Sequence, residues 1–284
     1  MKDNICQYIG DLITARVETI LNAAGDASGD APEGSEYNAE WFHELRKQVR
    51  SLRALLIFVK PLDSEKRLYP IRIKLRDWFR TGDVRRDLDV LAARWEILRR
   101  QLPASGGDSF LSKYFNTRIL SIKTVAPDGK LAAALADLQA VMDRGGWCKE
   151  KKPPKDFAKK RLSRWEKKLI NIGSSLKTLD KKDLHALRIK CKNIRYAMEA
   201  FLPIWLKKNT VEMLKTLKNL QDILGQIHDI DNTPNIIAEI LNNEVPLGAF
   251  ETGFLIGWQS AERADYIRLL NKEWRHYLKA VNAI

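Results

Sequence analysis

The sequence lacks any long apolar run. Its apolar stretches are short, as in Ala54–Val59, whereas a membrane-spanning helix needs about 20 residues. The first residues, MKDNICQYIGDLI, carry polar and acidic side chains where a signal peptide would have an apolar stretch. We therefore expect no membrane association and a cytoplasmic location.

Cysteine is also scarce. The chain of 284 residues has three, Cys6, Cys148 and Cys191. They lie far apart, and no Cys-x-x-Cys pair is present that could hold a metal or act in redox chemistry. The odd count and wide spacing favour a protein whose thiols are reduced.

Glycine and proline cluster between periodic segments rich in Leu, Ala, Lys, Arg and Glu, which predicts an all-α fold. The interruption most typical of a boundary is Arg144–Asp156, with paired glycines, paired prolines and a lysine run. Further loops are expected at residues 22–36, 102–108, 125–129 and 242–248.

Acidic residues are outnumbered. The chain has 49 Lys and Arg against 36 Asp and Glu, which gives a formal charge of +13. Such an excess indicates an acidic partner: nucleic acid, an anionic membrane surface or a phosphate-rich ligand.

The sequence contains an internal repeat. HELRKQVRSLR (His43–Arg53) aligns without a gap on HALRIKCKNIR (His185–Arg195), 142 residues later. At the same offset, RDLD (Arg86–Asp89) aligns on HDID (His228–Asp231). Two separate motifs that share one offset predict a tandem duplication with two helical bundles, residues 1–146 and 152–284.

Each repeat carries a row of basic residues. At 100° per residue, the four basic positions of each helix fall within a sector of about 80°. An apolar stripe on the opposite side, with Leu187, Cys191 and Ile194 in the second repeat, is expected to pack into the bundle and to bury Cys191. The basic row itself is expected to stay outside the core. The rows are His43, Arg46, Arg50, Arg53 and His185, Arg188, Lys192, Arg195.

A solvated helix surface is the simplest alternative for these rows. Solvated surfaces usually mix charges of both signs, but neither row contains an acidic residue. Like charges three or four residues apart repel each other, so we expect an anionic ligand to offset the repulsion. Two related helices facing each other would form one basic groove that could follow a linear polyanion.

These motifs resemble the CHAD domain family. The resemblance rests on His-x-φ-Arg-x-x-x-basic-x-φ-Arg (φ, apolar) in each half, followed by LGQIHDID (Leu224–Asp231) and, less regularly, TGDVRRDLD (Thr81–Asp89). It implies one CHAD domain over residues 1–284, with two pseudo-symmetric four-helix bundles around a basic central cavity. It further implies non-catalytic binding of long-chain inorganic polyphosphate by both rows, with no cofactor, and association with polyphosphate granules.

Further basic residues are expected to add to the site. Arg161 and Arg164 lie on the first helix of the second half, and Arg76 and Lys218 are equivalent under the repeat offset. An ordinary basic surface is the alternative for Arg161 and Arg164.

Asp87 and Asp229 are expected to orient basic side chains through ion pairs. A metal site is disfavoured because the repeat equivalent of His228 is Arg86, which cannot ligate a metal.

Two other functions remain open. A nucleic-acid-binding helical module fits the charge, although single-strand binders interleave aromatic residues with their cations and neither row contains one. A metal- or histidine-dependent phosphate enzyme is the third possibility, but the rows supply no carboxylate ligands and the chain has no phosphate-cradling glycine loop. The sequence does not indicate an oligomeric state.

Overall fold

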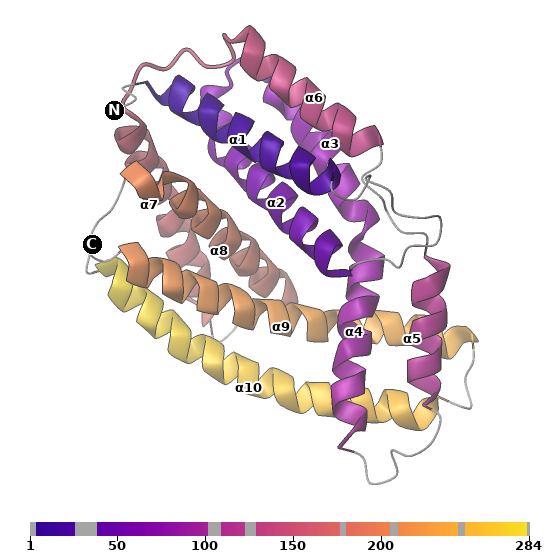
Figure 1. The fold of residues 1–284 in the computed structure, drawn as a ribbon. Helices are drawn as coiled ribbons and strands as arrows, with labels where there is room; N and C mark the ends of the chain where they lie inside the picture. The colour runs from indigo at the N-terminus through magenta and orange to yellow at the C-terminus, as the bar shows by residue number, and fades with distance from the viewer. Residues whose placement is uncertain are drawn as a thin grey trace. The chain divides into compact units, whose positions relative to one another are not determined.

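The computed structural model describes residues 4–25, 39–101, 109–122, 129–176, 180–204, 210–243 and 248–282. Throughout these ranges the regular elements are helices, which confirms the all-α prediction (Figure 1). None of them combines the length and the apolar character that a membrane crossing needs. The elements are α1 (Ile5–Gly25), α2 (Ala39–Phe58), η1 (Lys60–Leu62), α3 (Leu68–Thr81), α4 (Asp83–Arg99), α5 (Phe110–Ser121), α6 (Gly129–Arg144), α7 (Pro154–Gly173), α8 (Lys181–Phe201), η3 (Leu202–Ile204), α9 (Thr210–Asn243) and α10 (Ala249–Asn282).

Most of the predicted interruptions fall outside the described residues. This is so for residues 26–36, 102–108, 125–128 and 244–247. The segment at 144–156 is described: α6 ends at Arg144, and α7 begins at Pro154. Gly145 and Gly146 have φ values of 64° and 70°, a conformation that glycine adopts without the strain other residues incur.

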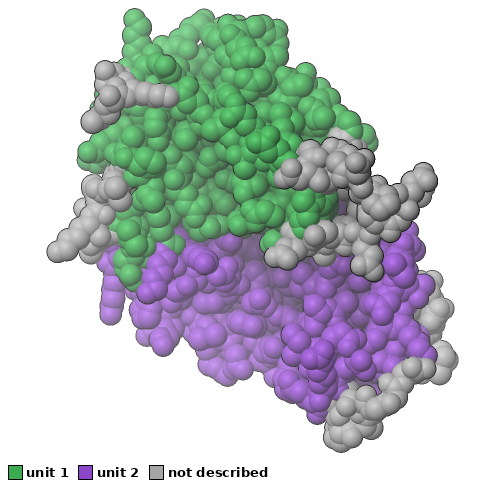
Figure 2. Space-filling model, viewed as in Figure 1, with its two compact units in different colours: residues 1–81, 124–168, 192–214 green, residues 82–123, 169–191, 215–284 purple. Residues whose placement is uncertain are grey.

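The chain forms two compact units, each drawn from three segments (Figure 2). Unit 1 comprises residues 1–81, 124–168 and 192–214, and unit 2 comprises residues 82–123, 169–191 and 215–284. Each unit therefore takes residues from both of the halves predicted from the repeat, and the helix α8 contributes to both units.

In unit 1, four helices pack together so that each contacts two of the others: α1 contacts α2, α2 contacts α3, α3 contacts α6, and α6 contacts α1 (Figure 1). Their contact surfaces are aliphatic stripes at helical spacing, such as Ile9, Ile13 and Val17 of α1, which are fully or almost fully buried. The carboxylate of Asp63 caps α3 by accepting hydrogen bonds from the backbone N–H groups of Arg67 (2.8 Å) and Leu68 (2.9 Å).

Unit 2 has a core in which side chains of α4 and α5 pack with Ile237 of α9 and Leu255 of α10. The first turn of α5 is fixed by Glu251 of α10, whose Oε2 accepts a hydrogen bond from the backbone N–H of Leu111 at 2.7 Å. The close approach of α7 and α10 requires glycine at position 173, since a Cβ there would lie 2.0 Å from the Trp274 ring.

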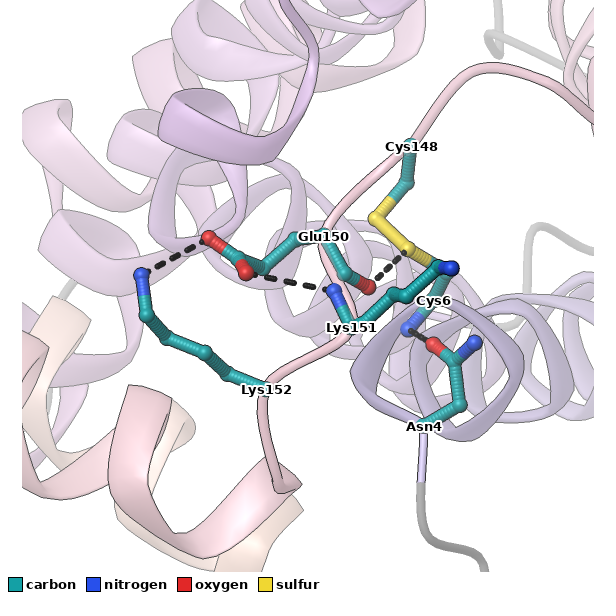
Figure 3. The surroundings of a disulfide bond; sticks show 6 residues. All are labelled: Asn4, Cys6, Cys148, Glu150, Lys151 and Lys152. Atoms are coloured by element: carbon teal, nitrogen blue, oxygen red, sulfur yellow. Dashed lines mark hydrogen bonds and ion pairs between the residues drawn. A yellow bond between two sulfur atoms is a disulfide. The ribbon is translucent and has the colours of Figure 1, made fainter.

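A disulfide joins Cys6, in the first turn of α1, to Cys148 in the segment that follows α6 (Figure 3). The segment runs beside the start of α1, where the backbone N–H of Ile5 donates to the carbonyl of Lys152 at 3.2 Å. Cys6 Sγ also lies 3.0 Å from the carbonyl oxygen of Glu150. The prediction that all three thiols are reduced is therefore wrong for this pair, because the fold brings together residues that are distant in sequence.

Cys191 matches its prediction. It is a fully buried free cysteine, and burial raises the pKa of its thiol to about 12. A thiol with such a pKa stays protonated and behaves as a small apolar side chain.

Candidate functional site

The basic row of the first repeat lies on α2, within unit 1. Its apolar partner stripe is buried as predicted: Leu45, Val49, Leu52 and Leu56 have no exposed surface. The residues of the row differ in their exposure to solvent along the helix. His43 is exposed, Arg50 and Arg53 are half-buried, and Arg46 is buried.

Three arginines of this row converge on one aromatic ring, that of Phe79 in α3. The guanidinium carbons of Arg46, Arg50 and Arg53 lie 4.0, 5.1 and 4.9 Å from the ring centroid. We call these four residues the Phe79 cluster. Attraction between the cations and the electron-rich ring face offsets part of the repulsion among them.

Arg46 has a structural role within the cluster. Its side chain is only 3% exposed, and Nη1 donates a hydrogen bond to the carbonyl of Phe79 at 2.7 Å. That carbonyl lies in the last turn of α3, where backbone acceptors have no partner within the helix. The expectation that the whole row is spared from the core is therefore wrong at Arg46, because the end of α3 needs a donor there.

Arg50 has unused hydrogen-bonding capacity. Its Nε is buried and has no hydrogen-bond partner among the described residues. A buried donor without an acceptor is costly, and a charged donor is satisfied best by an anionic oxygen. The Phe79 cluster therefore offers both positive charge and an unmet donor to an anion.

The row of the second repeat lies on α8. Its first two members, His185 and Arg188, belong to unit 2, and Lys192 and Arg195 belong to unit 1. His185 is exposed and the other three are half-buried. Arg195 is held in place by Glu199, which accepts a hydrogen bond from Nη1 at 2.8 Å, and by the ring of Tyr196 at 4.3 Å.

In unit 2, His185 lies beside a second histidine, His228 of α9, with ring centroids 5.1 Å apart. The pKa of His228 is lowered to about 4, chiefly by burial and then by the positive charge of Arg188. His228 is therefore neutral near pH 7. A bound anion at this position would favour its protonation.

Arg86 of α4 connects the two sequence repeats within unit 2. Its Nη1 and Nη2 donate to the two carboxylate oxygens of Asp229 at 3.2 and 3.3 Å, and Nη1 also donates to Asp87 at 2.9 Å. The two aspartates singled out in the sequence thus hold the same guanidinium, and Asp229 is the neighbour of His228 in sequence.

The four secondary basic residues differ in their surroundings. Arg161 donates to the carbonyls of Phe58 (3.1 Å) and Ile57 (3.5 Å) at the end of α2, and burial lowers its pKa. Arg76 donates to Asp77 at 2.9 Å. Arg164 and Lys218 are exposed. Arg161 is therefore committed to capping α2, whereas the long side chains of Arg164 and Lys218 reach solvent.

The sequence did not predict that Phe79 and His228 belong to the site. Phe79 has no aromatic equivalent in the second repeat, where Gln221 stands at the same offset, so the repeat carried no signal for it. His228 did have a signal, since it aligns with a cation in the first repeat. Arg72 of α3 was missed too, and its Nε is buried without a hydrogen-bond partner among the described residues.

Over the same described ranges, no three His, Cys, Asp or Glu side chains gather as they would around a metal ion.

Comparison with known proteins identifies the family. The CHAD domain family model matches residues 23–235. A crystal structure of the CHAD domain from the plant Ricinus communis aligns with a TM-score of 0.71 at 17% identity, covering 96% of this chain and 93% of that chain. No curated protein sequence matches. The family match spans both basic rows and most of the chain, and on that basis this protein belongs to the CHAD domain family.

Proposed function

We propose that this protein binds long-chain inorganic polyphosphate through its two basic rows and does not catalyse a reaction on it. The observation that carries the proposal is the Phe79 cluster, in which three guanidinium groups gather on one ring and Arg50 Nε has no acceptor in the described part of the chain. The resemblance of both rows to the CHAD pattern points to the same ligand.

The spacing of the row suits a linear polyanion. Four basic positions along about 15 Å of helix present charge-assisted hydrogen bonds to successive phosphate groups. Within the cluster, Arg50 and Arg53 are the best placed for this role, because both are half-buried rather than buried. Arg46 contributes charge while it holds the end of α3.

The second row extends the proposal. Arg188 and His185, with His228 beside them, form the phosphate-binding surface of unit 2, and Lys192 and Arg195 add to that of unit 1. The prediction that both rows, from two repeated bundles, line one basic groove is part of this proposal. It implies that long chains bind more tightly than short ones, because one molecule would engage both rows.

Single-stranded nucleic acid is the second candidate, and the presence of Phe79 among the arginines favours it. Single-strand binders use such rings to stack bases. In the Phe79 cluster, however, the ring is already contacted by three guanidinium groups at 4.0–5.1 Å. A ligand without bases fits this arrangement better.

A competition experiment tests the proposal. Long-chain polyphosphate, short polyphosphate and single-stranded DNA would be titrated against the protein over a series of salt concentrations. We expect long polyphosphate to bind most tightly. Its affinity should fall steeply as the salt concentration rises, because binding releases counterions from the polyanion. Equal competition by DNA would contradict the proposal, and turnover of polyphosphate with added divalent metal would contradict its non-catalytic part.

A further inference from the structure

Unit 2 contains a cavity of about 450 Å³ between α4 and α10, and none of the residues that line it belongs to the basic rows. This volume is in the usual range for small-molecule sites. One wall is a stripe of α10 in which Trp258, Glu262 and Tyr266 follow each other at intervals of four residues. The facing wall, from α4, includes Val90 and Ile97.

Two residues that line this cavity carry a buried polar atom without a hydrogen-bond partner among the described residues: Gln259 Nε2 and Glu262 Oε2. Both atoms are buried, and the whole of Gln259 is only 2% exposed. One is a donor and the other an acceptor, on residues one helical turn apart. Because unpaired buried polar atoms are costly, a ligand that pairs with both would remove a cost that the empty site carries.

The neighbouring Arg94 does not supply a hydrogen bond to Glu262 Oε2. Arg94, which also lines the cavity, donates to Gln226 Oε1 of α9. Its guanidinium is therefore engaged with α9, while no donor from the described part of the chain reaches Glu262 Oε2.

The apolar part of the cavity suits a flat ring. Trp258 is 41% exposed and Ile97 is 65% exposed, so both cavity-lining residues leave apolar surface in contact with solvent. The Trp258 ring is supported from behind by Phe254, with centroids 6.3 Å apart. A planar ligand would cover this exposed aromatic surface by stacking on Trp258.

We propose that this cavity binds a nucleobase whose edge carries a ring N–H beside a carbonyl oxygen, as guanine and uracil do. The ring N–H would donate to Glu262, the carbonyl would accept from Gln259 Nε2, and the ring would stack on Trp258. An alkylamine would satisfy Glu262 alone and leave Gln259 Nε2 without an acceptor. The site goes beyond polyphosphate binding and uses other residues.

Calorimetric titration of the full chain with guanosine tests this proposal, with uridine as a second probe. We expect guanosine to bind with a Kd below about 1 mM. N1-methylguanosine lacks the ring N–H, and adenosine lacks both the ring N–H and the carbonyl. Both should bind at least about tenfold more weakly, the factor that loss of one well-placed hydrogen bond produces.

Three variants locate the site. Gln259→Met removes the donor at nearly constant volume, so it should weaken guanosine binding at least about tenfold while the Tm stays the same or rises. Trp258→Leu should weaken binding about tenfold or more. Phe250→Leu makes the same kind of change at a 74% exposed position of α10 that does not line the cavity, and it should leave binding unchanged.

Several results would overturn the proposal: no binding of guanosine at 5 mM, equal binding of adenosine, undiminished binding of guanosine by Gln259→Met, or binding of an alkylamine such as tyramine in place of guanosine. None of these depends on polyphosphate, so failure here is distinguishable from failure of the proposed function.

Discussion

At the scale of single residues, the arginines of one row perform different tasks. Arg46 is buried and bonded to the Phe79 carbonyl, whereas Arg50 and Arg53 remain half-buried on the same ring. The sequence does not distinguish the three arginines. Helical periodicity predicts the side of the helix on which a side chain lies, but not which residues of a neighbouring helix it contacts. The row could be predicted from the sequence, but the different roles of its arginines could not.

Arg46→Ala is expected to destabilise unit 1 by about 2–4 kcal/mol, because it removes a charge-assisted hydrogen bond and leaves the Phe79 carbonyl without a donor. Chemical denaturation would measure the loss. Arg53→Ala, which removes a half-buried guanidinium from the same ring, serves as the matched control and should cost clearly less. Equal losses for the two variants would contradict the structural role of Arg46.

The burial of His228 is expected to make the stability of the protein depend on pH. Its pKa in the folded protein is lowered from 6.5 to about 4, so between these values the unfolded chain binds more protons than the folded chain. Stability should therefore fall as the pH is lowered from 7 to 4. Thermal unfolding over this pH range would show it, with His228→Gln showing a smaller fall; an identical pH dependence in the variant would argue against this assignment.

Ligand binding should act on His228 in the opposite direction. A polyphosphate near His185 and His228 raises the pKa of His228, so binding should take up protons and become tighter between pH 7 and pH 5. Calorimetry in buffers of different ionisation enthalpy measures this uptake. Proton release on binding, or no net exchange, would place the polyphosphate away from the two histidines.

At the scale of elements, the helices and both basic rows could be predicted from the sequence, since helical periodicity and the repeat are local patterns. The Cys6–Cys148 disulfide and the Phe79 cluster could not, because they depend on which helices become neighbours. One signal was available: Cys6 and Cys148 are separated by 142 residues, the same offset as the two basic rows, and therefore occupy equivalent positions in the repeat.

The disulfide is expected to stabilise unit 1, since it ties the start of α1 to the segment after α6 and closes a loop across 142 residues. Loop-closure entropy sets an upper estimate of ~5 kcal/mol. A reducing agent should therefore lower the Tm of the native chain. The Cys6→Ser/Cys148→Ser variant should show the lower Tm with and without reductant. If the reductant leaves the native Tm unchanged, the bond adds nothing to stability.

At the scale of the whole molecule, the formal charge of +13 attracts any polyanion, so binding by the rows has to be measured separately from the effect of the overall charge. The motifs of the two repeats resembled the CHAD family, and the family match confirmed the membership. What the family pattern did not contain is the contribution of α3, through Phe79, to the row on α2.

The most direct test of the central claim compares two double variants with equal loss of charge. Arg50→Gln/Arg53→Gln changes the Phe79 cluster and keeps part of each alkyl stem, while Lys159→Gln/Lys167→Gln changes two exposed lysines of α7 in the same unit. We predict that the first weakens binding of long-chain polyphosphate at least about tenfold and the second less than about twofold, with helicity unchanged in both. Equal weakening in the two variants would contradict the account, because net charge alone would then explain the binding.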